Sequence, residues 1–139
     1  MELIWSLSSS QKKYNGELAV QCSLLHDVLE DTLITYQEIE DKFGFQVAQG
    51  VLALSKNNKI ESKRDQLIDS LNRIKQQPKE IWMVKLADRI TNLSPPPFYW
   101  NNEKIQSYKE DANLIYNYLY KSNTFLSERL KNRIQAYNY

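Results

Sequence analysis

Apolar residues recur at helical spacing along almost the whole chain, and this periodicity limits the fold more than any other feature. The alternating β-branched pattern of strands is nearly absent, and three glycines and four prolines offer few interruptions. A capping-box pattern at Thr35 opens a short helix that Gly44 should close. The other predicted helices cover 17–31, 45–56, 60–77, 81–93, 103–121 and 125–137, after an amphipathic stripe of Leu3, Ile4 and Leu7. The sequence therefore predicts an all-α fold, a compact helical bundle without a sheet.

Length and charge exclude several classes of protein. A chain of 139 residues suits one domain that covers 1–139. Its net charge of +1, from 18 basic and 17 acidic residues, argues against a broad binding surface for nucleic acid or membrane. No apolar run approaches the roughly 20 residues that span a bilayer, and the N-terminus lacks the pattern of a signal peptide. Cys22 is alone in an apolar run, which predicts a buried thiol and a cytoplasmic location.

The only histidine, His26, is followed by three acidic residues within two helical turns. On one continuous helix His26 would share an arc with Asp27, Glu30 and Asp31, opposite an apolar face. A solvated surface is one reading of such a cluster. The other is a cation site, because the mutual repulsion of the carboxylates would be relieved by a bound positive charge. A zinc site of the Cys/His cluster type is excluded for want of ligands.

A second polar stripe lies on a helix that is apolar on most of its sides. Lys85, Asp88, Arg89 and Asn92 follow the spacing i, i+3, i+4, i+7 within 81–93, so they share one face. A helix of this composition is typically central, and buried charges need partners or metals. The stripe therefore indicates either an internal ion pair of Asp88 with Arg89 or Lys85, or carboxylate ligands that suit manganese, iron or zinc.

The two segments together resemble a known family. His26-Asp27-Val28-Leu29-Glu30-Asp31, then Phe43-Gly44, then Val84-Lys85-Leu86-Ala87-Asp88-Arg89-Ile90-Thr91-Asn92-Leu93 and Pro95-Pro96-Pro97 are similar to the HD hydrolase domain of RelA/SpoT-type enzymes and their small stand-alone relatives. Those enzymes remove pyrophosphate from the 3′ position of the alarmone (p)ppGpp. The resemblance covers most of the chain in order, and the combined pattern is far more specific than an isolated His-Asp pair.

The resemblance implies metal ligands for Mn²⁺, acidic residues that position the attacking water, and contacts to a guanosine alarmone substrate. The implied metal ligands are His26, Asp27 and Asp88. The implied water-positioning acids are Glu30 and Asp31, and the implied substrate contacts are Asn92 and Lys85. The implied activity is that of a metal-dependent (p)ppGpp 3′-pyrophosphohydrolase, in which the ion lowers the pKa of bound water. No nucleic acid or membrane partner is implied.

The chain departs from the family pattern at its beginning. Family members carry a further histidine ligand on an earlier helix, then a basic loop and a Tyr-x-x-His-Pro segment, and none of these is present. We therefore expect a domain that is N-terminally incomplete relative to the family, with three ligands and weakly bound Mn²⁺. Three alternatives stay open: an inactive helical remnant that serves as a binding or regulatory module, an HD hydrolase of another nucleotide, and a homo-oligomer in which a second chain completes the site.

Overall fold

The computed structural model describes residues 2–9 and 14–139, and within these two ranges it contains helices and no β-strand. The all-α prediction is confirmed. The helices are α1 (Glu2–Ser9), α2 (Gly16–Leu25), α3 (Val28–Asp31), α4 (Tyr36–Phe43), α5 (Phe45–Leu54), α6 (Lys63–Lys75), α7 (Lys79–Asn92), α8 (Asn102–Leu119), the 3₁₀ turn η1 (Tyr120–Ser122) and α9 (Thr124–Ala136).

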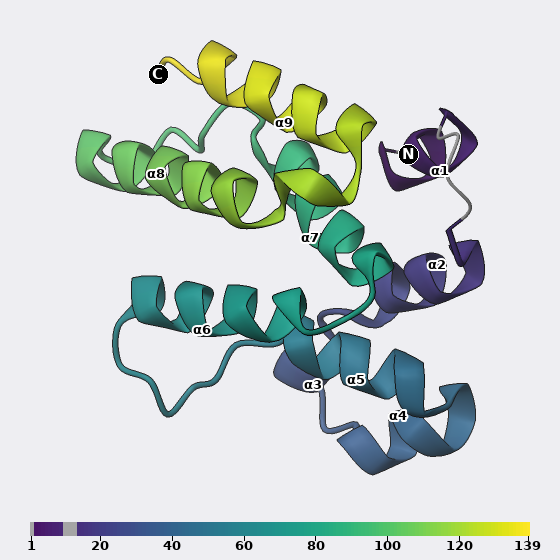
Figure 1. Ribbon diagram of the computed structural model, residues 1–139. Helices are drawn as coiled ribbons and strands as arrows, with labels where there is room; N and C mark the ends of the chain where they lie inside the picture. Colours follow the sequence, from purple (N-terminus) through teal and green to yellow (C-terminus); the bar gives the residue numbers. More distant parts are fainter. Residues whose placement is uncertain (1, 10–13) are drawn as a thin grey trace.

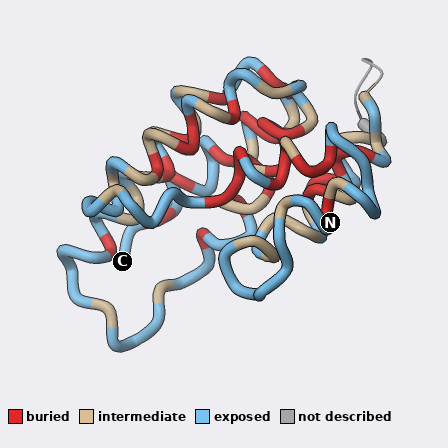
Figure 2. Tube along the Cα trace, turned by 90° about the horizontal axis from the view of Figure 1, so that it is seen from below, coloured by how far each residue is buried: buried red, intermediate tan, exposed pale blue. Residues whose placement is uncertain are grey.

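Helix α7 is the centre of the bundle. It crosses the middle of the molecule between the α8–α9 pair and the group formed by α2 to α5 (Figure 1). Its side chains Ile81, Met83, Leu86 and Ile90 are fully buried, as expected for a helix that is apolar on most sides. Each such side chain contributes about 1.5–3 kcal/mol through the hydrophobic effect. Figure 2 shows buried residues running along the central helices, whereas the connecting loops are largely exposed.

Local capping signals explain where several helices begin and end. The Thr35 hydroxyl oxygen accepts a hydrogen bond from the Glu38 main-chain N–H, and Gly44 ends α4, so both predictions for this helix are confirmed. Gly44 has a φ of 93°, a left-handed conformation that other residues rarely adopt. It lets the chain turn at once from α4 into α5. The predicted helix 60–77 begins later, at Lys63, because the Ser62 hydroxyl caps Asp65 N–H.

The prediction of one helix over 17–31 is wrong. Helix α2 ends at Leu25, residues 26–27 form a turn, and α3 begins at Val28. The His26 ring explains the break. Its Nδ1 lies 2.6 Å from the main-chain oxygen of Ser23, the acceptor that the Asp27 N–H would use in an unbroken helix. A side-chain donor has thus replaced a main-chain donor at this point.

The N-terminal stripe is only partly as predicted. Leu3 is buried and Leu7 is half-buried, but Ile4 is 52% exposed. Helix α1 is instead fastened by Glu2, whose two carboxylate oxygens accept hydrogen bonds from the guanidinium of Arg129 on α9. This charge-assisted pair joins the beginning of the chain to its last helix.

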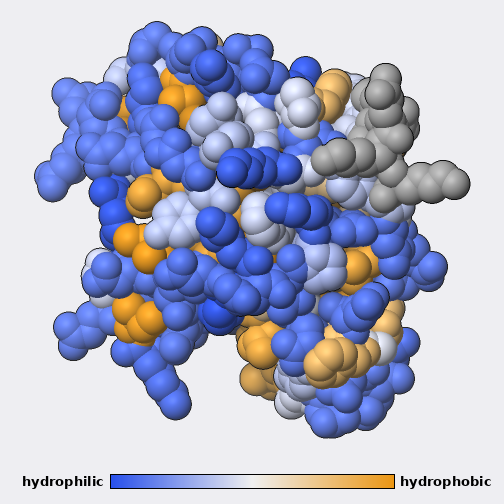
Figure 3. All heavy atoms as spheres, in the orientation of Figure 1, coloured by the Kyte–Doolittle hydropathy of each residue, from blue (hydrophilic) through white to orange (hydrophobic). Residues whose placement is uncertain are grey.

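Two further expectations from the sequence can be compared with the structure. Cys22 is buried, with its thiol 3.7 Å from the Val47 main-chain oxygen, and burial raises its pKa to about 12. The prediction of a buried thiol is therefore confirmed, and its raised pKa disfavours the reactive thiolate. None of the described helices is long and apolar enough to cross a membrane. The face seen in Figure 3 is mainly hydrophilic, with separate hydrophobic patches, several of them near α4 at the lower right.

Candidate functional site

The turn between α2 and α3 faces the middle of α7, and this brings the predicted metal ligands together. The His26 Nε2 atom lies 3.2 Å from Asp27 Oδ2 and 3.4 Å from Asp88 Oδ1. Asp27 is exposed, whereas Asp88 is half-buried. Two residues that are far apart in sequence, on α7 and beside α2, therefore meet as predicted.

The hydrogen bond between His26 and Ser23 fixes the orientation of the imidazole. A carbonyl oxygen can only accept, so the Nδ1 atom must carry the proton that is donated to Ser23. In the neutral ring, Nε2 is then left with a lone pair that points towards two carboxylates. Such an arrangement is repulsive unless a cation, either a proton or a metal ion, lies between the three groups. Histidine ligands of metals are commonly oriented by a second hydrogen bond of this kind.

The pKa values of the pair reflect this demand for positive charge. The hydrogen bond to Asp88 raises the pKa of His26 to about 9, and the contact with Ser23 acts in the same direction. Burial alone would raise the pKa of Asp88, but the hydrogen bond from His26 and the charge of Lys85 outweigh burial and lower it. The imidazole and its carboxylates therefore favour a state in which a cation is shared between them.

The spacing of the donors allows us to test whether a metal ion would fit. Ligands about 2.1 Å from an ion, on neighbouring coordination positions, lie about 3 Å apart. The two distances from His26 Nε2, 3.2 and 3.4 Å, are close to that value. Within residues 2–9 and 14–139, however, no group of three or more His, Cys, Asp or Glu side chains is placed so that it could hold a metal ion. The types of donor, one nitrogen and two carboxylates, are those that suit a divalent ion, but their present placement does not form a metal site.

The two acidic residues of α3 have different surroundings. One carboxylate oxygen of Glu30, Oε1, accepts a hydrogen bond from the main-chain N–H of Lys56, which follows α5. This bond restrains the Glu30 carboxylate and leaves Oε2 available. Asp31 is exposed, as is Glu30, and among the described residues its side chain forms no hydrogen bond or ion pair with His26, Asp27 or Asp88. The structure thus restrains the first predicted water-positioning residue more than the second.

The polar stripe of α7 contributes the remaining predicted residues. Lys85 is half-buried; burial lowers the pKa of its ammonium group, whereas the nearby Asp88 acts in the opposite direction. The Asn92 amide nitrogen lies 3.4 Å from Asp88 Oδ1, to which it donates. Both residues therefore stand beside the His26–Asp88 pair.

The sequence left open an internal ion pair of Asp88 with Arg89 or Lys85, and the described residues do not form it. Asp88 pairs with His26 instead. The Arg89 guanidinium lies over the ring of Tyr108, 4.0 Å from its centroid, and donates to the Tyr108 main-chain oxygen. Arg89 therefore stabilises the fold through a cation–π contact with Tyr108 and does not take part in the pairing of Asp88 with His26.

Two contacts in this region were absent from the sequence-based prediction. The Ser23 oxygen that orients His26 lies three residues earlier, a short-range relation that a search for side-chain-to-main-chain bonds could have suggested. The Lys56 N–H that holds Glu30 comes from 26 residues away and depends on how α5 packs, so no local pattern reveals it.

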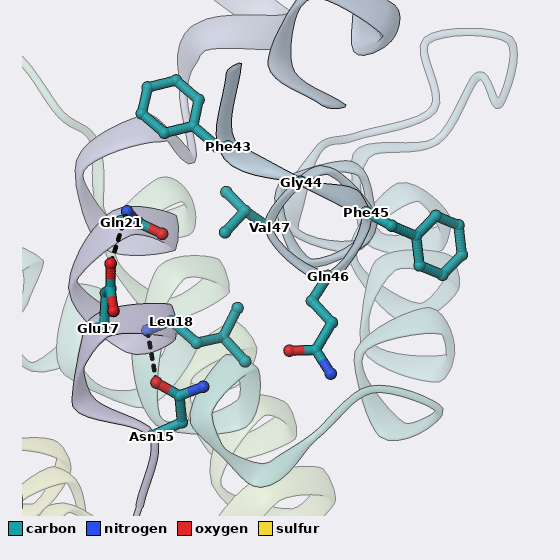
Figure 4. A pocket seen from close by; sticks show the side chains of 9 residues that line it. All are labelled: Asn15, Glu17, Leu18, Gln21, Phe43, Gly44, Phe45, Gln46 and Val47. Carbon is teal, nitrogen blue, oxygen red and sulfur yellow. Dashed lines mark hydrogen bonds between the residues drawn. The ribbon is translucent and has the colours of Figure 1, made fainter. Parts of the chain in front are cut away.

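Two hollows lie outside this cluster. The first, of about 400 Å³, lies between α2 and the α4–α5 junction and is shown in Figure 4, where Leu18 and Val47 face each other. Glu17 is the one charged residue in its lining. The second, of about 460 Å³, lies at the end of α5 and against α6. It is lined by Leu52, Ser55, Lys56, Asn57, Asn58, Lys59, Asp69 and Arg73.

The chain is similar to known proteins both in sequence and in structure. No family model matches the chain. Curated relatives include the guanosine-3′,5′-bis(diphosphate) 3′-pyrophosphohydrolase MESH1 of Danio rerio, which is 34% identical over 129 residues, covering 85% of this chain and 69% of that protein. The MESH1 protein of Mus musculus is 34% identical over 124 residues, covering 82% of this chain and 65% of that protein. The chain thus spans about two thirds of the length of these relatives.

A solved structure agrees with the fold. The structure of a metazoan orthologue of SpoT, described as hydrolysing ppGpp, matches with a TM-score of 0.79 at 23% identity and covers 97% of this chain and 77% of that one. An all-helical bundle with a His-Asp turn facing a central aspartate defines the HD class of hydrolase domains. Within that class, the chain belongs to the MESH1 family of guanosine-3′,5′-bis(diphosphate) 3′-pyrophosphohydrolases.

Proposed function

We propose that this chain is a metal-dependent phosphohydrolase that releases pyrophosphate from the 3′ position of a guanosine alarmone. The observation that carries the proposal is the convergence of Asp27 and Asp88 on His26 Nε2, in a chain whose relatives are named for this reaction. We place the reaction in the cytoplasm, in keeping with a lone, buried cysteine.

In this proposal His26, Asp27 and Asp88 hold a Mn²⁺ ion. A bound divalent ion lowers the pKa of a water molecule and offsets charge on phosphoryl oxygens. The Ser23 oxygen keeps the Nδ1 proton in place, so that Nε2 presents its lone pair to the ion. The Asn92 amide holds Asp88 through Oδ1 and stands where a nucleotide could be contacted.

Glu30 is the residue that we assign to proton transfer. Its Oε1 is occupied by the Lys56 N–H, so the carboxylate is held in place while Oε2 can accept a proton from the attacking water. Asp31, exposed beside Glu30, has a secondary role in orienting that water. This assignment ranks the two acids by how firmly each is restrained.

Lys85 is suited to phosphate binding because its ammonium group is half-buried and has no carboxylate at ion-pair distance among the described residues. Burial of an ammonium group without a partner is unfavourable, which is why the pKa of Lys85 is lowered. A phosphate oxygen beside Nζ would compensate for this burial. The ammonium group of Lys85 is therefore more stable with an anionic substrate bound beside it than in the empty site.

The direct test is release of pyrophosphate from ppGpp, followed by ³¹P NMR with added Mn²⁺. We expect release by the natural chain and none by Asp88→Asn, which removes a ligand but preserves the shape of the side chain. A chain that binds Mn²⁺ without hydrolysing ppGpp or another nucleotide would contradict the enzymatic proposal. In that case a binding or regulatory module would be the remaining function.

A further inference from the structure

The second hollow, which we call the basic hollow, has the charge expected of a site for an anion. Its lining contains Lys56, Lys59 and Arg73 against a single carboxylate, that of Asp69. Its volume of about 460 Å³ falls within the range of about 300–1,000 Å³ typical of ligand sites. The hollow of Figure 4 provides a contrast, because Glu17 is the one charged group in its lining.

The charge that remains available in the basic hollow comes from the two lysines. Arg73 already donates to Asp69 and to the main-chain oxygens of Leu52 and Ser55, so its guanidinium is used to hold the end of α5. Neither Lys56 nor Lys59 forms an ion pair with a carboxylate among the described residues. Two of the residues that line the hollow are thus lysines without an ion-pair partner among the described residues.

The loop that carries these lysines is held in a defined shape. The Asn57 side-chain oxygen accepts a hydrogen bond from Lys59 N–H, and its main-chain oxygen accepts one from Ile60 N–H. Arg73 fixes the beginning of the same loop through Ser55. The positions of the lysine main-chain atoms are therefore set before any ligand arrives, which lowers the entropic cost of binding.

The basic hollow is next to the candidate site. The main-chain N–H of Lys56 donates to Glu30, so the loop contacts the acid that we assign to proton transfer. Burial is the main reason why the pKa of Lys85 on α7 is lowered, and the charge of Lys56 acts in the same direction as a smaller cause. A substrate bound at His26 and Asp88 could therefore extend past Lys85 towards the loop.

We propose that the basic hollow binds the 5′-diphosphate of the alarmone while its 3′-diphosphate lies at His26 and Asp88, so that Lys56 and Lys59 determine how strongly the chain selects for 5′ phosphates. This inference rests on the proposed function. The 3′ and 5′ diphosphates of such a nucleotide are attached to the same ribose, so when one lies at His26 and Asp88 the other can reach only cationic groups close by, and the basic hollow offers two lysines.

The experiment compares two substrates with two double variants. The substrates are ppGpp and the analogue with a 5′-monophosphate, and the variants are Lys56→Gln/Lys59→Gln and the control Lys42→Gln/Lys131→Gln. The control removes the same charge from exposed positions outside the hollow. Glutamine at position 56 retains the main-chain N–H that holds Glu30.

We expect the first variant to raise KM for ppGpp about tenfold at low salt, with a smaller rise for the 5′-monophosphate analogue and little change in kcat. The control should resemble the natural chain. An unchanged KM, or an equal rise for both substrates, would overturn the inference while leaving the proposed function intact.

A binding measurement separates failure of this inference from failure of the proposed function. Calorimetric titration with inorganic pyrophosphate needs no turnover. Binding should weaken in Lys56→Gln/Lys59→Gln and persist in the control variant. If the natural chain hydrolyses nothing, weaker binding still supports an anion site at the hollow, and unchanged binding rejects it.

Discussion

The substitution Asp88→Asn should change the titration of His26 in a way that can be measured directly. Asp88 is the largest cause of the increase in the pKa of His26 from 6.5 to about 9. Asparagine keeps the size of the side chain but removes its charge, so the pKa of His26 should fall most of the way back. Asp27→Asn should have a smaller effect, because Asp27 is exposed and the last of the causes.

The same shift has a consequence for stability. His26 is protonated more readily in the folded chain than in the unfolded chain, so its contribution is fully present below pH 6.5 and is lost as the pH rises through about 9. A difference of that size corresponds to roughly 3 kcal/mol at most. In metal-free buffer the natural chain should therefore lose stability between pH 6.5 and 9.5, and Asp88→Asn should lose much less.

The chain contains one histidine, so a single C2–H resonance in the proton NMR spectrum reports this titration without assignment work. The titration is recorded with EDTA, and unfolding by urea at several pH values gives the stability. The reasoning would be refuted by a natural chain that titrates near 6.5, or by an Asp88→Asn variant that titrates like the natural chain.

Three further outcomes are expected. Glu30→Gln should retain Mn²⁺ binding in calorimetry yet lower the rate of pyrophosphate release by about 10²–10⁴-fold, and equal loss of binding and rate would contradict a role in proton transfer. Mn²⁺ should bind weakly to the isolated chain and more tightly at higher pH, since the ion competes with a proton at His26; tight, pH-independent binding would argue against this ligand set. Gly44→Ala should destabilise the chain by about 1–2 kcal/mol in urea unfolding, because φ is 93° there, and an unchanged stability would show that the α4–α5 turn can relax.

Much of the fold was predictable because its determinants are local. Residues close together in the sequence determine the cap at Thr35, the turn at Gly44 and the apolar sides of α7. The structure agrees with each of these predictions. The pairing of His26 with Asp88 was predictable for a different reason, since it depended on resemblance to a family whose two segments meet in space.

What the sequence did not reveal depends on competition or on long-range packing. The helix breaks after Leu25 because the His26 ring, and not the Asp27 N–H, donates to the Ser23 main-chain oxygen. The spacing of apolar residues does not indicate which of the two donors forms this bond. The bond from Lys56 to Glu30 and the basic hollow exist only once α5 and α6 have packed. The different restraint of Glu30 and Asp31, neighbours in sequence, follows from the same cause.

The break between α2 and α3 also determines which substitutions can be interpreted. Replacing His26 would free the Ser23 carbonyl to accept from Asp27 N–H, and the two short helices could then join into one. Such a variant would reorient Asp27 and Glu30 together with the loss of the imidazole, so an inactive His26 mutant would not identify which loss mattered. Asp88, in the interior of an uninterrupted helix, is the position where chemistry can be removed while the backbone stays as it is.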